Sequence, residues 1–599
     1  MMIALKGAVL VLSLLGYGMT CKRCRVPVPF CFPVAVSGVT VALYLMGFTG
    51  ALDLAAYGVL LVGLILLLCT AGKGSLSSFF SQQAVWFILL SVVWLFVITR
   101  GVTLSHADDG SHWYRVNKAI FYEKAYPTTP DITYYDYVPG VQIWNSFVQR
   151  FIGFSIPNCL FAQGLLNIFF VGSLFAGIDR LSGVKERVAA AAVICAGAVA
   201  LCCMTVGTYT LTVDMQLGCI AMAALIWVLH QGNESQAQLP AALMLSMLAL
   251  TKRSGLFFAL AVAVWAARRY RWRGRKLIAH LLFWLGIPVL LYLMYTLRTG
   301  MVYGGGADSL QGVSIERYSD LLMQKDADVL GSITKVFLYA LFIEGDKSML
   351  PLTVYSVFAA MYALYWQLKR KRCAAQAAEI RQGLLGTLAL LLIYIITLYV
   401  TYLLSMTNDE ALRMSSFSRY YGTAVLIVSG VSLYLMTSQI AAASRAGAVK
   451  GLAAYLMLCV FCVCMPGAYS KSYIFGRDSY RPPQRYHCGL WEKMEYYIPQ
   501  QNEYSEDRYL VFWEPSELYG IKRNEKRVKN AIISWVRSTN VDLMTAKHVN
   551  RNLDQQTLEA MRSYDYVVFM TKMTKRKKYL EPYLPIDDYT VGTREIIIE

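Results

Sequence analysis

Blocks of about 20 apolar residues with few charges recur along most of this 599-residue chain. A helix of that length crosses the hydrocarbon core of a bilayer, because each residue rises about 1.5 Å and the core is about 30 Å thick. Apolar residues make up 56% of the sequence, and only 16% of residues are charged. The pattern excludes a soluble enzyme, a fibrous protein and a disordered scaffold. It predicts an all-α polytopic membrane protein.

The apolar windows predict about 14 transmembrane helices. Residues 239–268 count as two short spans, because Thr251-Lys252-Arg253-Ser254 interrupts them. We therefore expect a transmembrane helical domain over residues 1–468. Its spans are expected at 2–20, 29–48, 51–71, 84–103, 156–177, 188–206, 209–229, 239–251, 254–268, 277–297, 349–368, 384–405, 421–441 and 452–468.

The basic residues predict how the spans are oriented. The chain has 56 Lys and Arg against 38 Asp and Glu, a formal net charge of +18. The densest basic runs, 268–276 and 369–372, directly flank apolar windows, which is typical of cytoplasmic anchors in a plasma membrane and not of nucleic-acid binding. With those runs inside, the N-terminus falls outside. The loops expected outside are 104–155, 298–348 and 406–420, together with the chain after 468.

The C-terminal part, residues 469–599, is polar and rich in tyrosine. It contains strand-like apolar runs at 509–513 and 564–569, next to helical stretches at 524–538 and 554–563. Alternating strands and helices predict a small extracytoplasmic α/β domain. No glycine-rich phosphate loop occurs in it.

Chemistry-bearing residues gather at the start of the first long outer loop. Asp108 and Asp109 are adjacent there, and His112 and Trp113 follow at once. Carboxylates at a membrane surface can act as a general base or hold a divalent cation. The alternative is structural, since either Asp could cap a helix that starts near Ser111.

Charged residues from other parts of the chain are expected on the same membrane face. Asp214 lies near the outer end of the window 209–229, where a charge is costly and therefore suggests a function. Lys252 and Arg253 lie in the turn between the two short spans, and Arg419 lies in the outer loop before the window 421–441. Cations placed together can bind phosphate. Alternatively, each cation pairs with an acid of a neighbouring loop.

This arrangement resembles the GT-C glycosyltransferases, which include protein O-mannosyltransferases and bacterial lipid A aminoarabinose transferases. The resemblance covers roughly residues 84–270. It rests on a long first outer loop that opens with Asp108-Asp109-Gly110-Ser111-His112-Trp113 and continues through Lys118 to Asp136-Tyr137-Val138-Pro139-Gly140. It implies that the donor is a sugar on a polyprenyl phosphate and that an acid of the pair, Asp108 or Asp109, is the catalytic base.

The sequence therefore predicts inverting transfer of a sugar from a polyprenyl-phosphate donor to an envelope glycan, lipid or protein. Phosphate leaves as a stable anion, so a single carboxylate suffices, unlike the pair that glycosidases need. The sequence assigns no cofactor. A divalent cation is a candidate, but no residues are assigned as its ligands. The expected substrate contacts are His112, Trp113, Lys118, Asp136, Tyr137, Asp214, Lys252, Arg253 and Arg419.

Other functional classes stay open. A transporter or flippase of lipid-linked sugars would show related halves and charges near the bilayer midplane, whereas the sequence has no internal repeat and its acids gather at one face. A polysaccharide polymerase or ligase and a non-catalytic assembly protein are the further alternatives. The stretch 139–152 has apolar residues at helical spacing and is expected to lie along the membrane surface.

Overall fold

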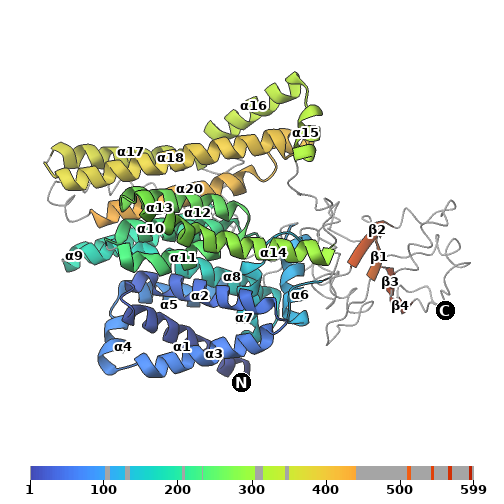
Figure 1. Ribbon diagram of the computed structural model, residues 1–599, viewed down its shortest axis with the longest axis horizontal. Helices are drawn as coiled ribbons and strands as arrows, with labels where there is room; N and C mark the ends of the chain where they lie inside the picture. Colours follow the sequence, from blue (N-terminus) through green and yellow to red (C-terminus); the bar gives the residue numbers. More distant parts are fainter. Residues whose placement is uncertain are drawn as a thin grey trace, which may run out of the picture.

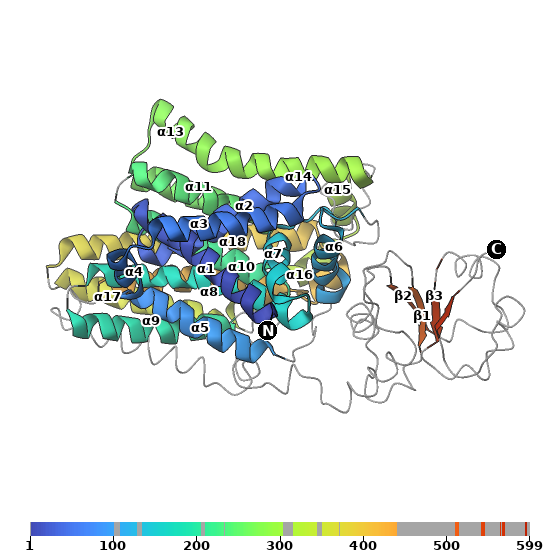
Figure 2. The ribbon, with the colours of Figure 1, turned by 90° about the horizontal axis from the view of Figure 1, so that it is seen from below.

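The computed structural model describes most of the chain up to residue 439 and five short segments beyond it. Figures 1 and 2 show that the helices of the first part run side by side and form one body. The described residues are 2–100, 108–128, 135–181, 183–204, 210–232, 234–303, 315–343, 350–370, 372–439, 509–513, 541–545, 564, 566–569 and 593–595.

The first helices pack in close contact, with α1 against both α2 and α3. They are α1 (Met2–Arg23), α2 (Val28–Gly47), α3 (Leu52–Thr70), α4 (Lys73–Phe80) and α5 (Gln83–Thr99). A Cβ atom built on Gly16 of α1 would overlap the carbonyl oxygen of Gly63 in α3, so this approach requires glycine. A proline stands in the first turn of α2, where its missing N–H costs no helical hydrogen bond.

The long loop after α5 folds into helices inside the body. It contains the π-helical turn η1 (Asp109–Trp113), α6 (Tyr114–Glu123) and α7 (Gly140–Ile152). The helix expected at 139–152 is therefore confirmed. Its expected place along the membrane surface stays a prediction, but other helices of the protein cover it. Even its polar residues Gln142, Asn145 and Gln149 are buried, because α1, α2, α6, α8 and α11 pack around it.

The helices after α7 include the two short ones expected within residues 239–268. The split expected within 239–268 is confirmed, since α11 ends at Thr251 and α12 begins at Ser254. The buried α20 packs against α9, α10, α17 and α18. The remaining elements are α8 (Ile156–Val171), η2 (Gly172–Arg180), α9 (Val184–Met204), α10 (Asp214–His230), α11 (Glu234–Thr251), α12 (Ser254–Arg269), α13 (Gly274–Leu281), η3 (Leu282–Gly286), α14 (Ile287–Tyr303), α15 (Ile315–Met323), α16 (Ala327–Phe342), α17 (Leu350–Arg370), α18 (Ala374–Leu404), α19 (Asn408–Leu412) and α20 (Phe417–Ser438).

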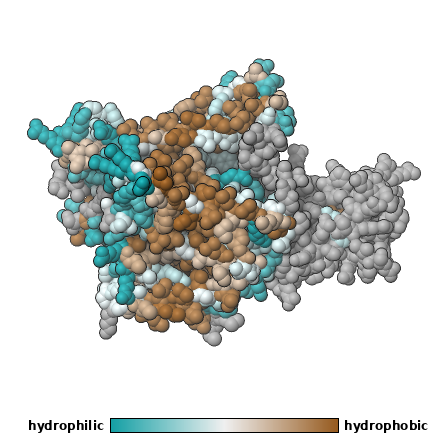
Figure 3. All heavy atoms as spheres, viewed as in Figure 1, coloured by the Kyte–Doolittle hydropathy of each residue, from teal (hydrophilic) through white to brown (hydrophobic). Residues whose placement is uncertain are grey.

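The helical body has the composition of a polytopic membrane protein. Among the described residues, seven helices are long and apolar enough to cross a bilayer, or eight if α4 and α5, bent by 68°, form one span. Figure 3 shows apolar side chains over the middle of the body and hydrophilic ones gathered at the left of the view. The total of about 14 spans stays a prediction, and the window 452–468 lies outside the described residues.

The basic turns mark one end of this body, which we call the basic end. Lys276 of α13 pairs with Glu234 at the start of α11, at 2.7 Å. The Tyr270 hydroxyl, after α12, donates to the carbonyl of Gln231, just after α10. The α10, α11 and α12 helices therefore each have one end here. Their opposite ends, which carry the predicted site, form what we call the site end. Which side of the membrane each end faces stays a prediction.

Four strands of the C-terminal part form one mixed sheet. They are β1 (Tyr509–Trp513), β2 (Val541–Thr545), β3 (Tyr566–Phe569) and β4 (Thr593–Glu595), in the order β2-β1-β3-β4. β1 is parallel to β2 and β3, and β4 is antiparallel to β3. The strands expected at 509–513 and within 564–569 are thus confirmed. The helices expected at 524–538 and 554–563 lie outside the described residues, so the α/β domain over 469–599 stays a prediction.

Candidate functional site

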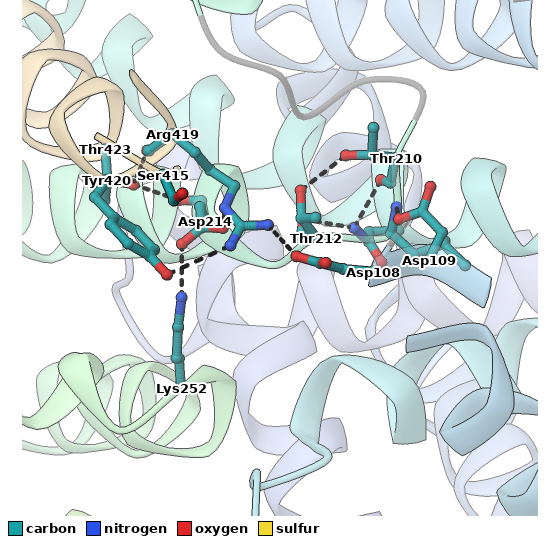
Figure 4. Close-up of polar contacts among 12 residues, drawn as sticks. Asp108, Asp109, Thr210, Thr212, Asp214, Lys252, Ser415, Arg419, Tyr420 and Thr423 are labelled. Atoms are coloured by element: carbon teal, nitrogen blue, oxygen red, sulfur yellow. Dashed lines mark hydrogen bonds and ion pairs between the residues drawn. The ribbon is translucent and has the colours of Figure 1, made fainter. Parts of the chain in front are cut away.

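A continuous chain of ion pairs lies at the site end and is centred on Arg419 (Figure 4). Its Nη1 atom lies 2.6 Å from Oδ2 of Asp108, and its Nε atom lies 3.0 Å from Oδ2 of Asp214. The other carboxylate oxygen of Asp214 lies 2.9 Å from Nζ of Lys252. Charged residues from four distant parts of the sequence therefore meet, as the loop alternation predicted.

Helix ends hold these side chains in place. Asp214 begins α10, where the partial positive charge of a helix N-terminus favours a carboxylate. Arg419 lies in the first turn of α20, and Lys252 lies in the turn between α11 and α12. The Thr423 hydroxyl of α20 donates to the backbone carbonyl of Asp214 at 3.2 Å. This bond fixes α20 against α10, so the arginine and its acid are positioned by the same contact.

Burial differs sharply along the ion-pair chain. The side chains of Asp214, Arg419 and Lys252 are 7%, 12% and 14% exposed, whereas that of Asp108 is 37% exposed. The formal charges of the four residues cancel, which allows so many ionised groups to lie in a largely buried site. Asp108 is therefore the carboxylate that an incoming molecule can reach.

The neighbouring acid, Asp109, is fully buried and faces a different part of the chain. Its Oδ1 atom accepts a hydrogen bond from the backbone N–H of Leu211 at 2.8 Å. Gln163 supports the same segment, because its amide donates to the carbonyls of Thr210 and Thr212 at 3.2 Å each. Asp109 thus fixes the position of the segment 210–212, which leads into Asp214 at the start of α10. Within the described residues Asp108 makes no capping hydrogen bond at η1, so the helix-cap alternative has no support for it.

The sequence reasoning did not include Tyr420 among the site residues. Nζ of Lys252 lies 4.8 Å from the centre of its ring, and Cζ of Arg419 lies 5.3 Å from it. A ring face near two cations attracts both and limits their movement. The tyrosine directly follows Arg419 in the sequence, but only the conformation of the first turn of α20 brings its ring under Lys252.

A second pair of charges, Arg253 and Asp136, lies at the same end. Nη2 of Arg253 lies 2.9 Å from Oδ2 of Asp136, and its Nε donates to the Tyr292 hydroxyl at 3.0 Å. Burial raises the pKa of Asp136 above its usual value, although Arg253 opposes that shift. The structure therefore pairs Arg253 with Asp136 and not with the Arg419 group. Tyr292 was not predicted from the sequence.

The remaining predicted residues lie inside the folded loop. The rings of His112, Trp113 and Tyr137 pack together, with centres 4.5 to 5.6 Å apart. Burial lowers the pKa of His112 to about 3, which keeps it neutral at physiological pH. Lys118 of α6 is also buried. A substrate-binding role for these residues stays a prediction, and the three rings pack against one another within the folded loop.

The described residues contain no group of three or more His, Cys, Asp or Glu side chains that could hold a metal ion. Asp108 and Asp214 each contact a cationic side chain instead. The positive charge at the site thus comes from Arg419 and Lys252, and a divalent cation stays a candidate.

Comparisons with solved structures give a likeness of fold. No family model matches the chain, and no curated protein matches it in sequence. Among solved structures, the chain is similar to ArnT from Cupriavidus metallidurans, crystallised with undecaprenyl phosphate bound. The match has 13% sequence identity and a TM-score of 0.45, and it covers 85% of this chain and 97% of that one. A likeness this weak is no basis for assigning a ligand or an activity to this chain. The function proposed next therefore rests on the site geometry.

Proposed function

We propose that the protein is a membrane glycosyltransferase that moves a sugar from a polyprenyl-phosphate donor to an extracytoplasmic glycan, lipid or protein. The observation that carries the proposal is the half-open carboxylate of Asp108, set beside the buried cations Arg419 and Lys252. This combination supplies a proton acceptor next to a phosphate-binding charge at the end of a membrane helix bundle. Together with the family resemblance of the loop 104–155, it favours an enzyme over a transporter.

Asp108 is the proposed base. Its contact with Arg419 favours the ionised carboxylate, and its 37% exposure leaves room for an acceptor. The acceptor hydroxyl loses its proton to Asp108 as its oxygen bonds to the anomeric carbon. The bond from that carbon to the phosphate oxygen breaks, and polyprenyl phosphate leaves with the electron pair. Asp109 would position the segment 210–212 and not exchange protons, because its carboxylate is buried on the Leu211 N–H.

Arg419 and Lys252 are the proposed partners of the donor phosphate. Both contact Asp214, and together with Asp108 the formal charges of this group cancel. Arg253 lies nearby with Asp136 and is the third candidate cation. Positioned cations stabilise the charge that develops on a leaving phosphate. On this assignment the basic end faces the cytoplasm of a plasma membrane, and the site end and the sheet β1–β4 lie outside.

The test compares two isosteric variants, Asp108→Asn and Asp109→Asn, in transfer from a labelled polyprenyl-phosphate sugar. Asp108→Asn should lower the rate by at least about 100-fold, the scale of general-base catalysis, and leave donor affinity nearly unchanged. Asp109→Asn should lose far less than this, because Oδ1 of the asparagine can still accept from Leu211 N–H. The control is Asp409→Asn, which removes an exposed acid from its 2.8 Å pair with Arg413.

The outcomes separate the alternatives. Near-normal rates in both loop variants would remove the carboxylate base from the proposal. A 100-fold loss in Asp109→Asn alone would transfer the role of base to Asp109. If the wild-type protein in liposomes moves labelled donor across the bilayer without transferring its sugar, the flippase class replaces the enzyme.

A further inference from the structure

A crevice of about 400 Å³ lies at the basic end, far from the ion-pair chain around Arg419. It opens between α1, α2 and α11, and Val59 of α3 contributes to one wall. Small side chains make room for it, since Ala35, Gly38 and Ala42 follow one another at helical spacing on α2. The size falls in the range of sites that hold small ligands, which is about 300 to 1,000 Å³.

The lining changes from polar to apolar along the crevice. At the end of the body, it is formed by Cys24, Arg25 and Gln236 in and around the first turns of α2 and α11. Further into the body, Val39 and Leu243 line it. The lining residues 235–243 of α11 span about 12 Å at 1.5 Å per residue. The crevice therefore matches an amphiphile with a polar head at the membrane surface and an alkyl chain toward the bilayer interior.

Arg25 lies at the polar end of the crevice, which we call its mouth, and supplies a positive charge that no described acid neutralises. The neighbouring Lys22 and Arg23 are engaged, because their side chains donate to Ser78 and to the carbonyl of Cys69. Within the part of the chain that the structure describes, the exposed side chain of Arg25 makes no hydrogen bond or ion pair. None of the described residues that line the crevice is an Asp or Glu. The mouth is therefore complementary to an anionic head group.

We propose that this crevice binds one anionic phospholipid of the leaflet that meets the basic end. The phosphate of the head group pairs with Arg25, and one acyl chain lies against Val39, Ala42 and Leu243. The site is separate from the proposed donor site, because the two lie at opposite ends of α11, at residues 235–243 and beside Lys252. It gives the protein a lipid contact that is independent of the glycosyl donor.

The experiment uses native mass spectrometry of the full chain purified in detergent. The protein is offered equal amounts of phosphatidylglycerol and phosphatidylcholine with identical acyl chains. The wild type should retain one lipid, predominantly the anionic one. Arg25→Gln should lower the ratio of anionic to zwitterionic lipid about five-fold, the effect of one arginine at a membrane surface. Ala42→Phe should fill the crevice and release the lipid.

The matched control is Arg271→Gln, since Arg271 is also an exposed arginine with a positive φ in a turn at the basic end but does not line the crevice. It should keep the wild-type lipid ratio. Leu239→Trp, at a rim residue that is 60% exposed, is a second filling variant whose folding is not at risk. Equal losses in Arg25→Gln and Arg271→Gln, or retention of the lipid by both filling variants, would overturn the proposal. So would displacement of the phospholipid by polyprenyl phosphate that depends on Arg25, because the occupant would then be a second isoprenoid lipid.

Discussion

Replacing Arg419 with Gln should show which of its two ion pairs, with Asp108 or with Asp214, contributes more to the free energy of unfolding. By distance alone Asp108 would rank first, since its contact is 2.6 Å and that of Asp214 is 3.0 Å. Burial reverses the order. The carboxylate of Asp108 is 37% exposed and remains hydrated without the arginine, so its pair should contribute at most about 1 kcal/mol.

Asp214 behaves differently because its side chain is only 7% exposed. Removing one partner of a buried pair typically costs about 3 to 5 kcal/mol, since the remaining charge stays desolvated. Asp214 keeps Lys252 at 2.9 Å, which places the expected loss near the lower limit. Arg419→Gln should therefore lower the free energy of unfolding by about 3 kcal/mol, most of it through Asp214.

Two double-mutant cycles measure these contributions separately. One combines Arg419→Gln with Asp214→Asn, and the other combines it with Asp108→Asn. Unfolding of the purified protein in mixed micelles, followed by tryptophan fluorescence, gives each free energy. We expect a coupling energy of about 2 kcal/mol for Asp214 and below about 1 kcal/mol for Asp108. A coupling for Asp108 that equals or exceeds that for Asp214 would refute the argument that desolvation, and not contact distance, controls this site.

Three further predictions concern buried charged groups and the orientation of the helical body. The lowered pKa of His112, about 3, and the raised pKa of Asp136 should give stability opposite pH dependences. Below pH about 6.5 the wild type should lose stability relative to His112→Gln, because only the unfolded histidine binds a proton readily. As pH falls from 7 toward 4, the wild type should gain stability relative to Asp136→Asn, because the folded Asp136 binds a proton more readily than the unfolded one. Lys325→Met should cost about 1 to 3 kcal/mol, because the ammonium group donates to two carbonyls at the end of α18, at 2.6 and 2.7 Å. Cysteines placed at Arg271 and Asp409 should react with impermeant reagents from opposite sides of the membrane, and only the one at 409 from outside.

Each of these predictions has a control or a contradicting result. Equal pH slopes for the two titration variants and the wild type would show that neither group changes its pKa on folding. Lys335→Met, at an exposed lysine of α16, should leave stability unchanged, and a loss equal to that of Lys325→Met would point to a general charge effect. Labelling of both cysteines from the same side would contradict the orientation of the basic end.

The sequence by itself determined the features that depend on local composition. Apolar blocks of bilayer length predicted the membrane helices, and the polar interruption at residues 251–254 predicted the break between α11 and α12. Alternation of the loops also predicted that Asp108, Asp214, Lys252 and Arg419 meet, because consecutive spans place their ends at alternate faces. Such features follow from the length, hydrophobicity and charge of single segments.

Tertiary structure alone decided what depends on contacts between distant segments. Asp108 and Asp109 are equivalent in the sequence, yet one is half open beside Arg419 and the other is buried on the Leu211 N–H. The helix α7, expected at the membrane surface, is enclosed by protein, because five other helices pack around it. Likewise Tyr420 became part of the site through the position of Lys252. The burial of a side chain depends on residues far away in the sequence, and burial in turn controls its accessibility and its charge state. No local pattern of residues contains this information.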